Sequence, residues 1–302
     1  MPSIQAVLFN WVMKATFKSK PIHLLEAKTL RDGADALAPK QPPAGVSCDV
    51  VEGAVKGEWH RAENAEPGRT VLYIHGGGYV FGSPRSHRAF TYSLAKAAQA
   101  EIFSLEYRMA PEHPFPAAVD DAVAAYEWLL GEGCDPAKLV IGGDSAGGGL
   151  ALALLLSIKA RGLPSPAGAL LLSPWTDLAT TGASLDENEK SDAMFKKVYI
   201  VEGAKRYLAA ADPKAPLASP LYADLTGLPP MLIFVSDSEV LRDDSTRLQE
   251  RLSAAGVQSK LVTEKGLIHV WPIFPGRFPE AMKSIREAAA FIREKTEMDV
   301  AA

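Results

Sequence analysis

The chain has 302 residues, of which 47% are hydrophobic, and 32 basic against 36 acidic residues leave a formal net charge of −4. A chain of this length can bury one large core, and α/β folds of this size commonly form a single domain. The slightly acidic balance, without a basic run, argues against nucleic acid and anionic membranes as partners. No stretch approaches the roughly 20 apolar residues of a membrane span.

The sequence also bears on the cellular compartment. Cys48 and Cys134 lie far apart and have no metal-like spacing; this favours a reducing compartment, although one disulfide stays open. The N-terminus lacks the basic start, long apolar core and A-x-A site of a signal peptide. We therefore expect a cytoplasmic protein without a membrane span, and the sequence leaves monomer and homodimer open.

Apolar residues with helical spacing begin the chain: Ile4, Val7, Leu8, Trp11, Val12 and Ala15. This spacing predicts an amphipathic helix. Its apolar stripe is expected to pack against its own domain or to cover a substrate cleft. Residues 32–45 are rich in turn formers and are predicted to connect this helix to two strands, 46–55 and 57–62.

A short buried strand, 71–74, runs directly into His75-Gly76-Gly77-Gly78-Tyr79. Three successive glycines let backbone N–H groups point at a reacting oxygen without side-chain interference. Alone, a glycine run after a strand is also typical of a plain loop or a phosphate cradle, but the Gly-Lys-Ser/Thr ending of a P-loop is absent. HGGG motifs of this kind supply oxyanion-hole donors in lipases and esterases. His75 is expected to orient the loop through a hydrogen bond.

The next elements alternate between helix and strand. Helices are predicted at 85–98 and 117–130, with a strand at 101–106 between them and another starting at 139. Such alternation is typical of a mostly parallel sheet covered on both faces.

Residues 138–160, KLVIGGDSAGGGLALALLLSIKA, form the most informative stretch. A strand, a glycine-rich turn with Ser145 at its apex and a helix are the context of a nucleophile elbow. Gly143 and Gly147 lack the β-carbons that would clash as strand and helix approach each other. The N-terminus of the helix adds backbone N–H groups and partial positive charge where an oxyanion would form.

The alternation continues with a strand at 167–173, breaks off over 180–228, and then resumes. The interrupted region has helical character at 193–208 and reads as an insertion that forms a lid with the N-terminal helix. After it come a strand at 231–235, a helix at 243–255, a strand at 258–263 and a helix at 279–295. We therefore divide the chain into an N-terminal part of a cap (1–45), a core (46–179), a cap insertion (180–228) and the rest of the core (229–302).

The order of the candidate catalytic residues along the chain identifies a candidate general base. In α/β-hydrolases the nucleophilic serine is followed by an acid and then by a histidine. Of six histidines only His269 follows Ser145. The acid should follow the strand at 231–235. Asp243 and Asp244 are placed to cap the next helix, so Asp237 and Glu239 are the candidates.

Six segments resemble the hormone-sensitive lipase family of α/β-hydrolases, the bacterial family IV carboxylesterases. They are HGGGY (75–79), YRMAPEHPFPAA (107–118), GDSAGGGLA (143–151), SPWTDL (173–178), SEVLRDD (238–244) and His269. The resemblance implies an α/β-hydrolase core of eight strands with a helical cap. It also implies Ser145 as nucleophile, His269 as base, and an oxyanion hole made by the N–H groups of Gly77, Gly78 and Ala146, with His75, Gly76 and Asp144 supporting the motifs.

Two positions depart from the family pattern. The family acid is usually the first Asp of D-x-L-x-D, which matches Glu239 here and favours it over Asp237. The family's His-Gly-Phe is replaced by His269-Val270-Trp271, whose bulk is expected to narrow the pocket without affecting the base.

These residues predict two-step acyl transfer from a small ester of short to medium chain length, without a metal or an organic cofactor. The expected pocket residues are Trp11, Tyr79, Phe195 and Tyr199. Two alternatives stay open: an amide hydrolase such as a deacetylase, and a small-ligand receptor on the same fold. Retention of His269 argues against the receptor, because related plant hormone receptors lose that histidine.

Overall fold

One eight-stranded β-sheet forms the centre of the structure, with its strands in the order β1-β2-β4-β3-β5-β6-β7-β8. The computed structural model describes residues 1–297. β2 is antiparallel to both of its neighbours, and the pairs from β4 to β8 are parallel, as the α/β alternation predicted. The strands are β1 (Val46–Val51), β2 (Lys56–Ala62), β3 (Thr70–Ile74), β4 (Glu101–Glu106), β5 (Leu139–Asp144), β6 (Gly168–Leu172), β7 (Met231–Ser236) and β8 (Ser259–Glu264).

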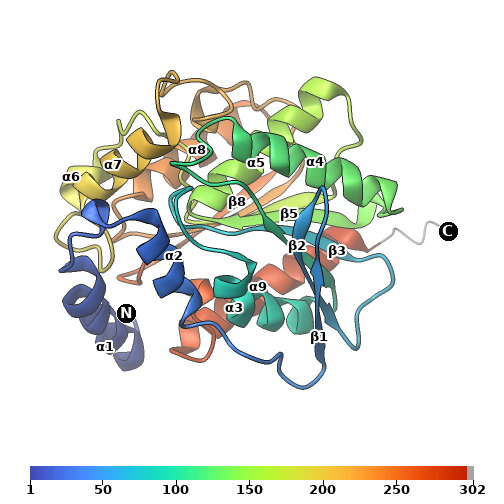
Figure 1. The fold of residues 1–302 in the computed structure, drawn as a ribbon, viewed down its shortest axis with the longest axis horizontal. Helices are drawn as coiled ribbons and strands as arrows, with labels where there is room; N and C mark the ends of the chain where they lie inside the picture. The colour runs from blue at the N-terminus through green and yellow to red at the C-terminus, as the bar shows by residue number, and fades with distance from the viewer. Residues whose placement is uncertain (298–302) are drawn as a thin grey trace.

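Helices cover both faces of the sheet (Figure 1). One face carries α3 (Pro84–Ala98) and α9 (Pro279–Thr296), and the other carries α4 (Ala117–Gly131), α5 (Ala146–Arg161) and α8 (Arg242–Ala254). Successive strand residues point to opposite faces, so Leu72 and Val71 enter different cores although both are fully buried. This two-sided burial explains why the central strands are continuous apolar runs.

Two segments lie together beyond the sheet, at the left of Figure 1. The N-terminal segment contains α1 (Ile4–Met13), a π-helical turn η1 (Lys14–Lys18), η2 (Ile22–Leu24) and α2 (Ala27–Asp35), and the insertion contains α6 (Ser184–Glu187) and α7 (Lys197–Leu208). Arg206 on α7 donates to the carbonyls of His23 and Leu25, at 2.6 and 3.1 Å. Hydrogen bonds from the Arg206 side chain to backbone carbonyls therefore link the two segments.

Sequence spacing did not find α2, and it misassigned the inner face of α1. Trp11 is 67% exposed and Leu8 60%, whereas Ala6 on the other side is buried. Phe9 and Met13 are the apolar residues of α1 that face the protein. The expectation that the stripe packs inward is wrong, because α1 is apolar on nearly every side and periodicity alone cannot then choose a face.

Between residues 1 and 297, no helix combines the length and the apolarity needed to cross a membrane. Cys48 and Cys134 are both free.

Lys18 links the N-terminal segment to the insertion from a buried position. Its Nζ donates to the carbonyl oxygen of Glu189 and, at 2.7 Å, to that of Asp192. Burial lowers the pKa of the Lys18 ammonium, although Asp192 opposes this change.

We expect Lys18→Met to lower the free energy of unfolding by about 1–3 kcal/mol, because two buried carbonyls lose their donor. Urea unfolding followed by circular dichroism measures this change. Lys20→Met removes a nearby exposed lysine and should change stability by less than about 0.5 kcal/mol. Equal unfolding midpoints for the two variants would contradict the assigned role of Lys18.

Candidate active site

Ser145 sits at the apex of a sharp turn between β5 and α5. Its backbone has φ 51° and ψ −121°, a left-handed region that non-glycine residues rarely adopt. The turn closes tightly enough that a β-carbon on Gly147 would overlap the carbonyl groups of Ile74 and His75. Glycine at this position therefore lets the start of α5 approach the end of β3, which leaves the serine strained and projecting above the sheet.

His269 and Glu239 form a buried pair beside this turn. Nδ1 of His269 lies 2.6 Å from Oε2 of Glu239, and both side chains have exposed fractions of 1% or less. The other carboxylate oxygen accepts from Ser173 Oγ at 2.8 Å and from Ser236 N at 2.7 Å. Burial alone would lower the pKa of His269, but the Glu239 carboxylate raises it above its ordinary value.

The structure brings Glu239, and not Asp237, to the histidine. Asp237 Oδ1 accepts instead from Gly266 N at 2.8 Å and closes a loop. Asp243 accepts from Ser184 N at 2.9 Å, away from His269. Although Glu239 and Asp237 are only two residues apart, the turn after β7 directs their side chains to different partners.

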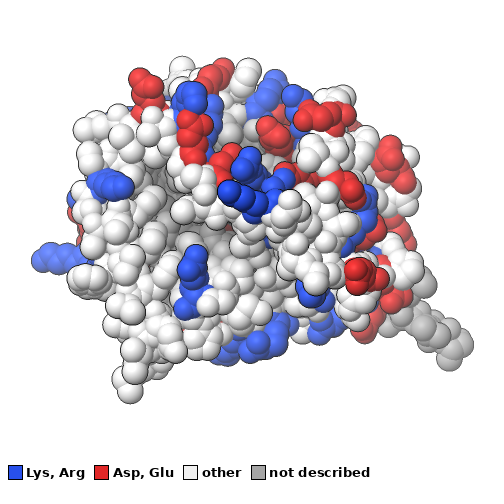
Figure 2. Space-filling model, turned by 60° about the horizontal axis from the view of Figure 1, so that its bottom comes forward, with Lys and Arg blue, Asp and Glu red and all other residues white. Residues whose placement is uncertain are grey.

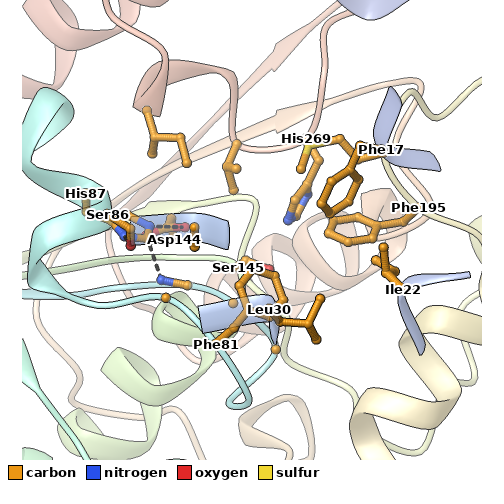
Figure 3. A pocket seen from close by; sticks show the side chains of 18 of the residues that line it. Phe17, Ile22, Leu30, Phe81, Ser86, His87, Asp144, Ser145, Phe195 and His269 are labelled. Carbon is orange, nitrogen blue, oxygen red and sulfur yellow. Dashed lines mark hydrogen bonds and ion pairs between the residues drawn. The ribbon is translucent and has the colours of Figure 1, made fainter. Parts of the chain in front are cut away.

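His269 and Ser145 line the same cavity, and the imidazole extends toward the serine side of it in Figure 3. Within the described part of the chain, Nε2 of His269 is buried and has no hydrogen-bond partner. The ring of Phe195 meets the imidazole edge-on at 5.0 Å. Nδ1 is thus held by a carboxylate, while the opposite nitrogen stays available to a group in the cavity.

Asp144 ties the glycine loop to the serine turn. Its Oδ1 accepts from Tyr73 Oη at 2.7 Å and from Gly76 N at 3.0 Å, and His87 Nε2 lies 3.3 Å from the same oxygen. Burial alone would raise the pKa of Asp144, but the His87 charge and the bond from Tyr73 lower it. The residue preceding Ser145 therefore anchors the loop that follows β3, and Figure 3 shows its contact with His87 as a dashed line.

The glycine loop carries the predicted oxyanion donors. Gly77 and Gly78 have φ values of +119° and +62°, conformations that only glycine adopts without strain. Their N–H groups donate no hydrogen bond within residues 1–297. Both glycines line the cavity beside Ser145, and Ala146 begins α5 at the same place.

His75 acts within the loop and does not line the cavity. Its Nδ1 donates to Gly76 O at 2.8 Å, and its ring stacks on Tyr107 at 4.4 Å between centroids. Burial lowers the pKa of His75 to about 3, so the ring is neutral near pH 7. Tyr107 Oη in turn donates to the His75 carbonyl at 2.9 Å.

The cavity has a volume of about 740 Å³ and is mostly apolar. Its walls come from the core and from both outer segments, and include Phe9, Met13, Phe17, Ile22, Leu30, Phe81, Phe195 and Tyr199. Of the four pocket residues expected from sequence, the structure places Phe195 and Tyr199 in the wall.

The other two expectations are wrong. Trp11 points to solvent from the outer side of α1. Tyr79 is 2% exposed and stacks on Tyr207 at 3.7 Å, behind the cavity wall. Tyr79 follows the last glycine and its side chain lies away from the cavity, so Val80 and Phe81 form this part of the wall.

Of the two bulky residues that follow His269, only Val270 lies in the pocket wall as expected. Val270 lines the cavity and adopts φ 51°, an unusual conformation for a β-branched residue. Trp271 is fully buried and donates from Nε1 to Ser284 Oγ at 2.9 Å. The tryptophan therefore fills the core under α9 and does not narrow the pocket.

Sequence reasoning missed Asp192, which lies in the insertion. Its Oδ2 accepts from Val240 N at 2.9 Å, next to Glu239, and its Oδ1 accepts from Phe195 N at 2.8 Å. Asn188 Nδ2 donates to the carbonyls of Asp237 and Glu239. No local motif marks Asp192 and Asn188 as part of the site, since their partners after β7 are 48 or more positions away.

One group of metal-type ligands lies within the described residues, far from the serine in sequence: Cys48, Glu58 and His60, with ligand atoms within 4.8 Å of one another. Arg88 already binds both oxygens of Glu58, at 2.6 and 2.8 Å. A guanidinium paired with the carboxylate opposes a second cation there, so this cluster reads as a buried ion pair.

Comparison with known proteins agrees with this geometry. A family described as having the alpha/beta hydrolase fold matches residues 71–273. An acetyl-hydrolase of Streptomyces hygroscopicus is 45% identical over 255 residues, covering 84% of each chain. An esterase of Acinetobacter venetianus is 36% identical over 284 residues and covers 93% of each.

Solved structures match nearly the whole chain. Crystals of EstE5 soaked with p-nitrophenyl butyrate contain a protein with a TM-score of 0.93 and 42% identity, covering 97% of this chain and 99% of that one. An esterase from the bacterial hormone-sensitive lipase family has a TM-score of 0.92 and 38% identity, covering 98% and 100%. The chain thus belongs to the α/β-hydrolase family and, within it, to the esterases of the bacterial hormone-sensitive lipase group.

Proposed function

We propose that the protein is a serine carboxylesterase that cleaves small esters of short to medium acyl chain length. The observation that supports this most directly is the His269–Glu239 pair, at 2.6 Å, in one cavity with a strained Ser145. A carboxylate on Nδ1 holds the proton there and leaves Nε2 as a base. The serine conformation directs its hydroxyl into the same space.

In the first step, Nε2 of His269 takes the proton from Ser145, and Oγ attacks the ester carbonyl carbon. The resulting imidazolium is stabilised by Glu239, which stays ionised. The oxyanion accepts hydrogen bonds from the N–H groups of Gly77, Gly78 and Ala146, each lowering the barrier by on the order of 3 kcal/mol. His269 then gives its proton to the leaving alcohol, and an acyl-enzyme remains.

In the second step, water replaces the alcohol. His269 takes one of its protons, the hydroxide oxygen attacks the acyl carbon, and the same oxyanion donors hold the second tetrahedral intermediate. Collapse releases the carboxylic acid and returns the proton to Ser145. All groups in both steps belong to the protein, the substrate or water.

The cap assignment supports a limit on substrate length. We propose that residues 1–45 and 180–228 act as a cap, since Phe17 and Phe195 from the two segments meet edge-on at 6.1 Å over the cavity. A site of about 740 Å³ enclosed by aromatic rings suits an acyl group of moderate size. Several curated relatives are named esterases, and two carry acetyl-hydrolase in their names.

Ser145→Ala should reduce kcat on p-nitrophenyl butyrate to less than about a thousandth of wild type, because no other group can form the acyl-enzyme. Circular dichroism checks that the variant is folded. Ser86→Ala is the matched control: Ser86 lines the same cavity and should be dispensable for acyl transfer. If Ser145→Ala kept a tenth of the wild-type kcat, the nucleophile assignment would fail.

Glu239→Gln should lower kcat by about four orders of magnitude, since the amide no longer sets the imidazole tautomer. Asp237→Asn is the control and should cost far less, because Asp237 contacts the loop at Gly266 and not the histidine. The reverse ranking, with both variants folded, would transfer the acid role to Asp237.

The same pair gives a pH dependence. His269 must be neutral to act as base, so kcat/KM should rise as pH increases through its pKa, which Glu239 holds above the ordinary value. In Glu239→Gln the carboxylate charge is gone but burial remains, so the acidic limb of the residual activity should move to lower pH. A limb that stays in place or moves upward would show that Glu239 does not set this pKa.

A panel of p-nitrophenyl esters tests the size of the acyl site. We expect kcat/KM to be highest between about C2 and C8 and to fall at C16, because the aromatic walls enclose a cavity of limited volume. Detergent-matched solutions keep the long esters dispersed. A higher kcat/KM for C16 than for C4 would contradict the proposed role of the cap.

A further inference from the structure

The outer side of α1 presents an unusual apolar surface. We call it the α1 face and define it as Ile4, Val7, Leu8, Trp11 and Val12, which are between 39% and 86% exposed. Within residues 1–297 the other large exposed hydrophobic side chains are Met1 at the start of the same segment and four scattered ones, Leu24, Leu37, Val50 and Val198. A contiguous apolar stripe of this kind marks an interaction surface.

The α1 face adjoins the active-site cavity. Phe9 and Met13 lie on the inner side of α1 and line the cavity wall, and Phe17 follows in the next turn. The same short helix therefore separates the substrate site from the exposed stripe. Whatever covers the α1 face lies against the cap that encloses the cavity.

The segment that carries the α1 face differs in charge from the whole chain. The first 25 residues contain no Asp or Glu, while Lys14 and Lys20 are both exposed at the end of the stripe. Three of the 32 basic residues lie in these 25 positions, so the other residues hold 29 basic against 36 acidic side chains and carry a net charge of −7. Figure 2 shows a hollowed, largely uncharged face with isolated Lys and Arg at its left, while most Asp and Glu lie toward the top and right of the view.

We infer that the α1 face docks on an anionic lipid bilayer, with Leu8 and Trp11 entering the boundary between headgroups and acyl chains and Lys14 and Lys20 near the phosphates. A helix with exposed Trp and Leu, flanked by Lys and free of acidic residues, has the composition of an interfacial helix. Each Lys near such a surface strengthens binding by roughly fivefold. The net charge of the chain argues against an anionic membrane as partner, but the local positive charge favours one at the α1 face.

Charge also distinguishes the bilayer from a second copy of the chain. Two-fold pairing with parallel α1 helices would set Lys14 and Lys20 against the same lysines of the other copy, and antiparallel pairing would set them against the apolar start of its stripe; α1 offers them no carboxylate in either case. An anionic surface places opposite charges there instead. Docking would bring the cap and the cavity behind it to the membrane, where apolar esters concentrate.

Flotation with extruded vesicles tests the inference independently of ester hydrolysis. The wild-type chain should float with phosphatidylcholine vesicles that contain 30 mol% phosphatidylglycerol and bind less to pure phosphatidylcholine. Leu8→Ser/Trp11→Ser should lower the partition coefficient at least about tenfold, and Lys14→Gln roughly fivefold. Activity on soluble p-nitrophenyl butyrate should be unchanged in these variants, so failure of docking and failure of the esterase assignment are separate results.

The controls are exposed residues on the distant edge of the sheet. Val50→Ser on β1 and Lys56→Gln on β2 should float like wild type, since both strands lie at the other side of the molecule from α1 (Figure 1). Absence of flotation, equal binding to the two kinds of vesicle, or equal loss in the control variants would overturn the inference. So would light scattering that shows a dimer which Leu8→Ser/Trp11→Ser dissociates, because a second copy would then cover the face.

Discussion

The close approach of α5 to the end of β3 is the contact on which the site depends. A β-carbon at Gly147 would overlap the backbone of Ile74 and His75, so the approach exists only because the turn is made of glycine. It places Ser145 in a strained conformation and sets Asp144 within bonding distance of Gly76. Ser145 and the glycine loop therefore follow two different strands but are positioned as one unit.

Burial strengthens this unit. Asp144 is a buried carboxylate that would be costly without partners, and Tyr73, Gly76 N and His87 satisfy it. Removing one partner leaves a charge uncompensated, whereas the complete group resists displacement of the loop. Such rigidity matters for an oxyanion hole, whose donors must already point at the site where charge develops.

A second chain of contacts connects the N-terminal segment and the insertion to Glu239. Lys18 donates to the Asp192 carbonyl, and the Asp192 carboxylate accepts from Val240 N and Phe195 N. Val240 follows Glu239, and Phe195 contacts the His269 ring. Residues of the insertion thus line the cavity, and they also position the turn that carries Glu239 and the part of the wall that faces His269.

Three of the seven non-glycine residues with positive φ in residues 1–297 lie around the same place. Ser145, Ser173 and Val270 all have positive φ values, and Ser173 Oγ bonds Glu239 and receives Val270 N. A strained backbone conformation persists where the surrounding contacts hold it in place. The unusual backbone conformation of Val270 is therefore held by Ser173, which also bonds Glu239, and not by the preference of a β-branched residue.

The sequence alone determined the features that depend on local backbone chemistry or chain order. A strand, glycines and a helix around Ser145 define the elbow, the glycine run after β3 defines a loop of N–H donors, and His269 was the only histidine left after the serine. Strand and helix alternation likewise determined the sheet, because short apolar runs bounded by turns and separated by helices are typical of buried parallel strands. Glu239 was favoured over Asp237 only through resemblance to a family motif.

Tertiary structure alone decided what depends on distance between remote segments. Glu239 and Asp237 share a sequence neighbourhood, and only the turn geometry after β7 sends one to His269 and the other to Gly266. The α1 stripe has a clear period, but a helix that is apolar on most sides can bury either face. Contacts with residues near positions 270 and 190 decide that Phe9 and Met13 face the protein while Trp11 faces solvent. Lys18 and Asp192 carry no local signal, because their roles arise from contacts across more than 40 residues, which spacing along a chain does not encode.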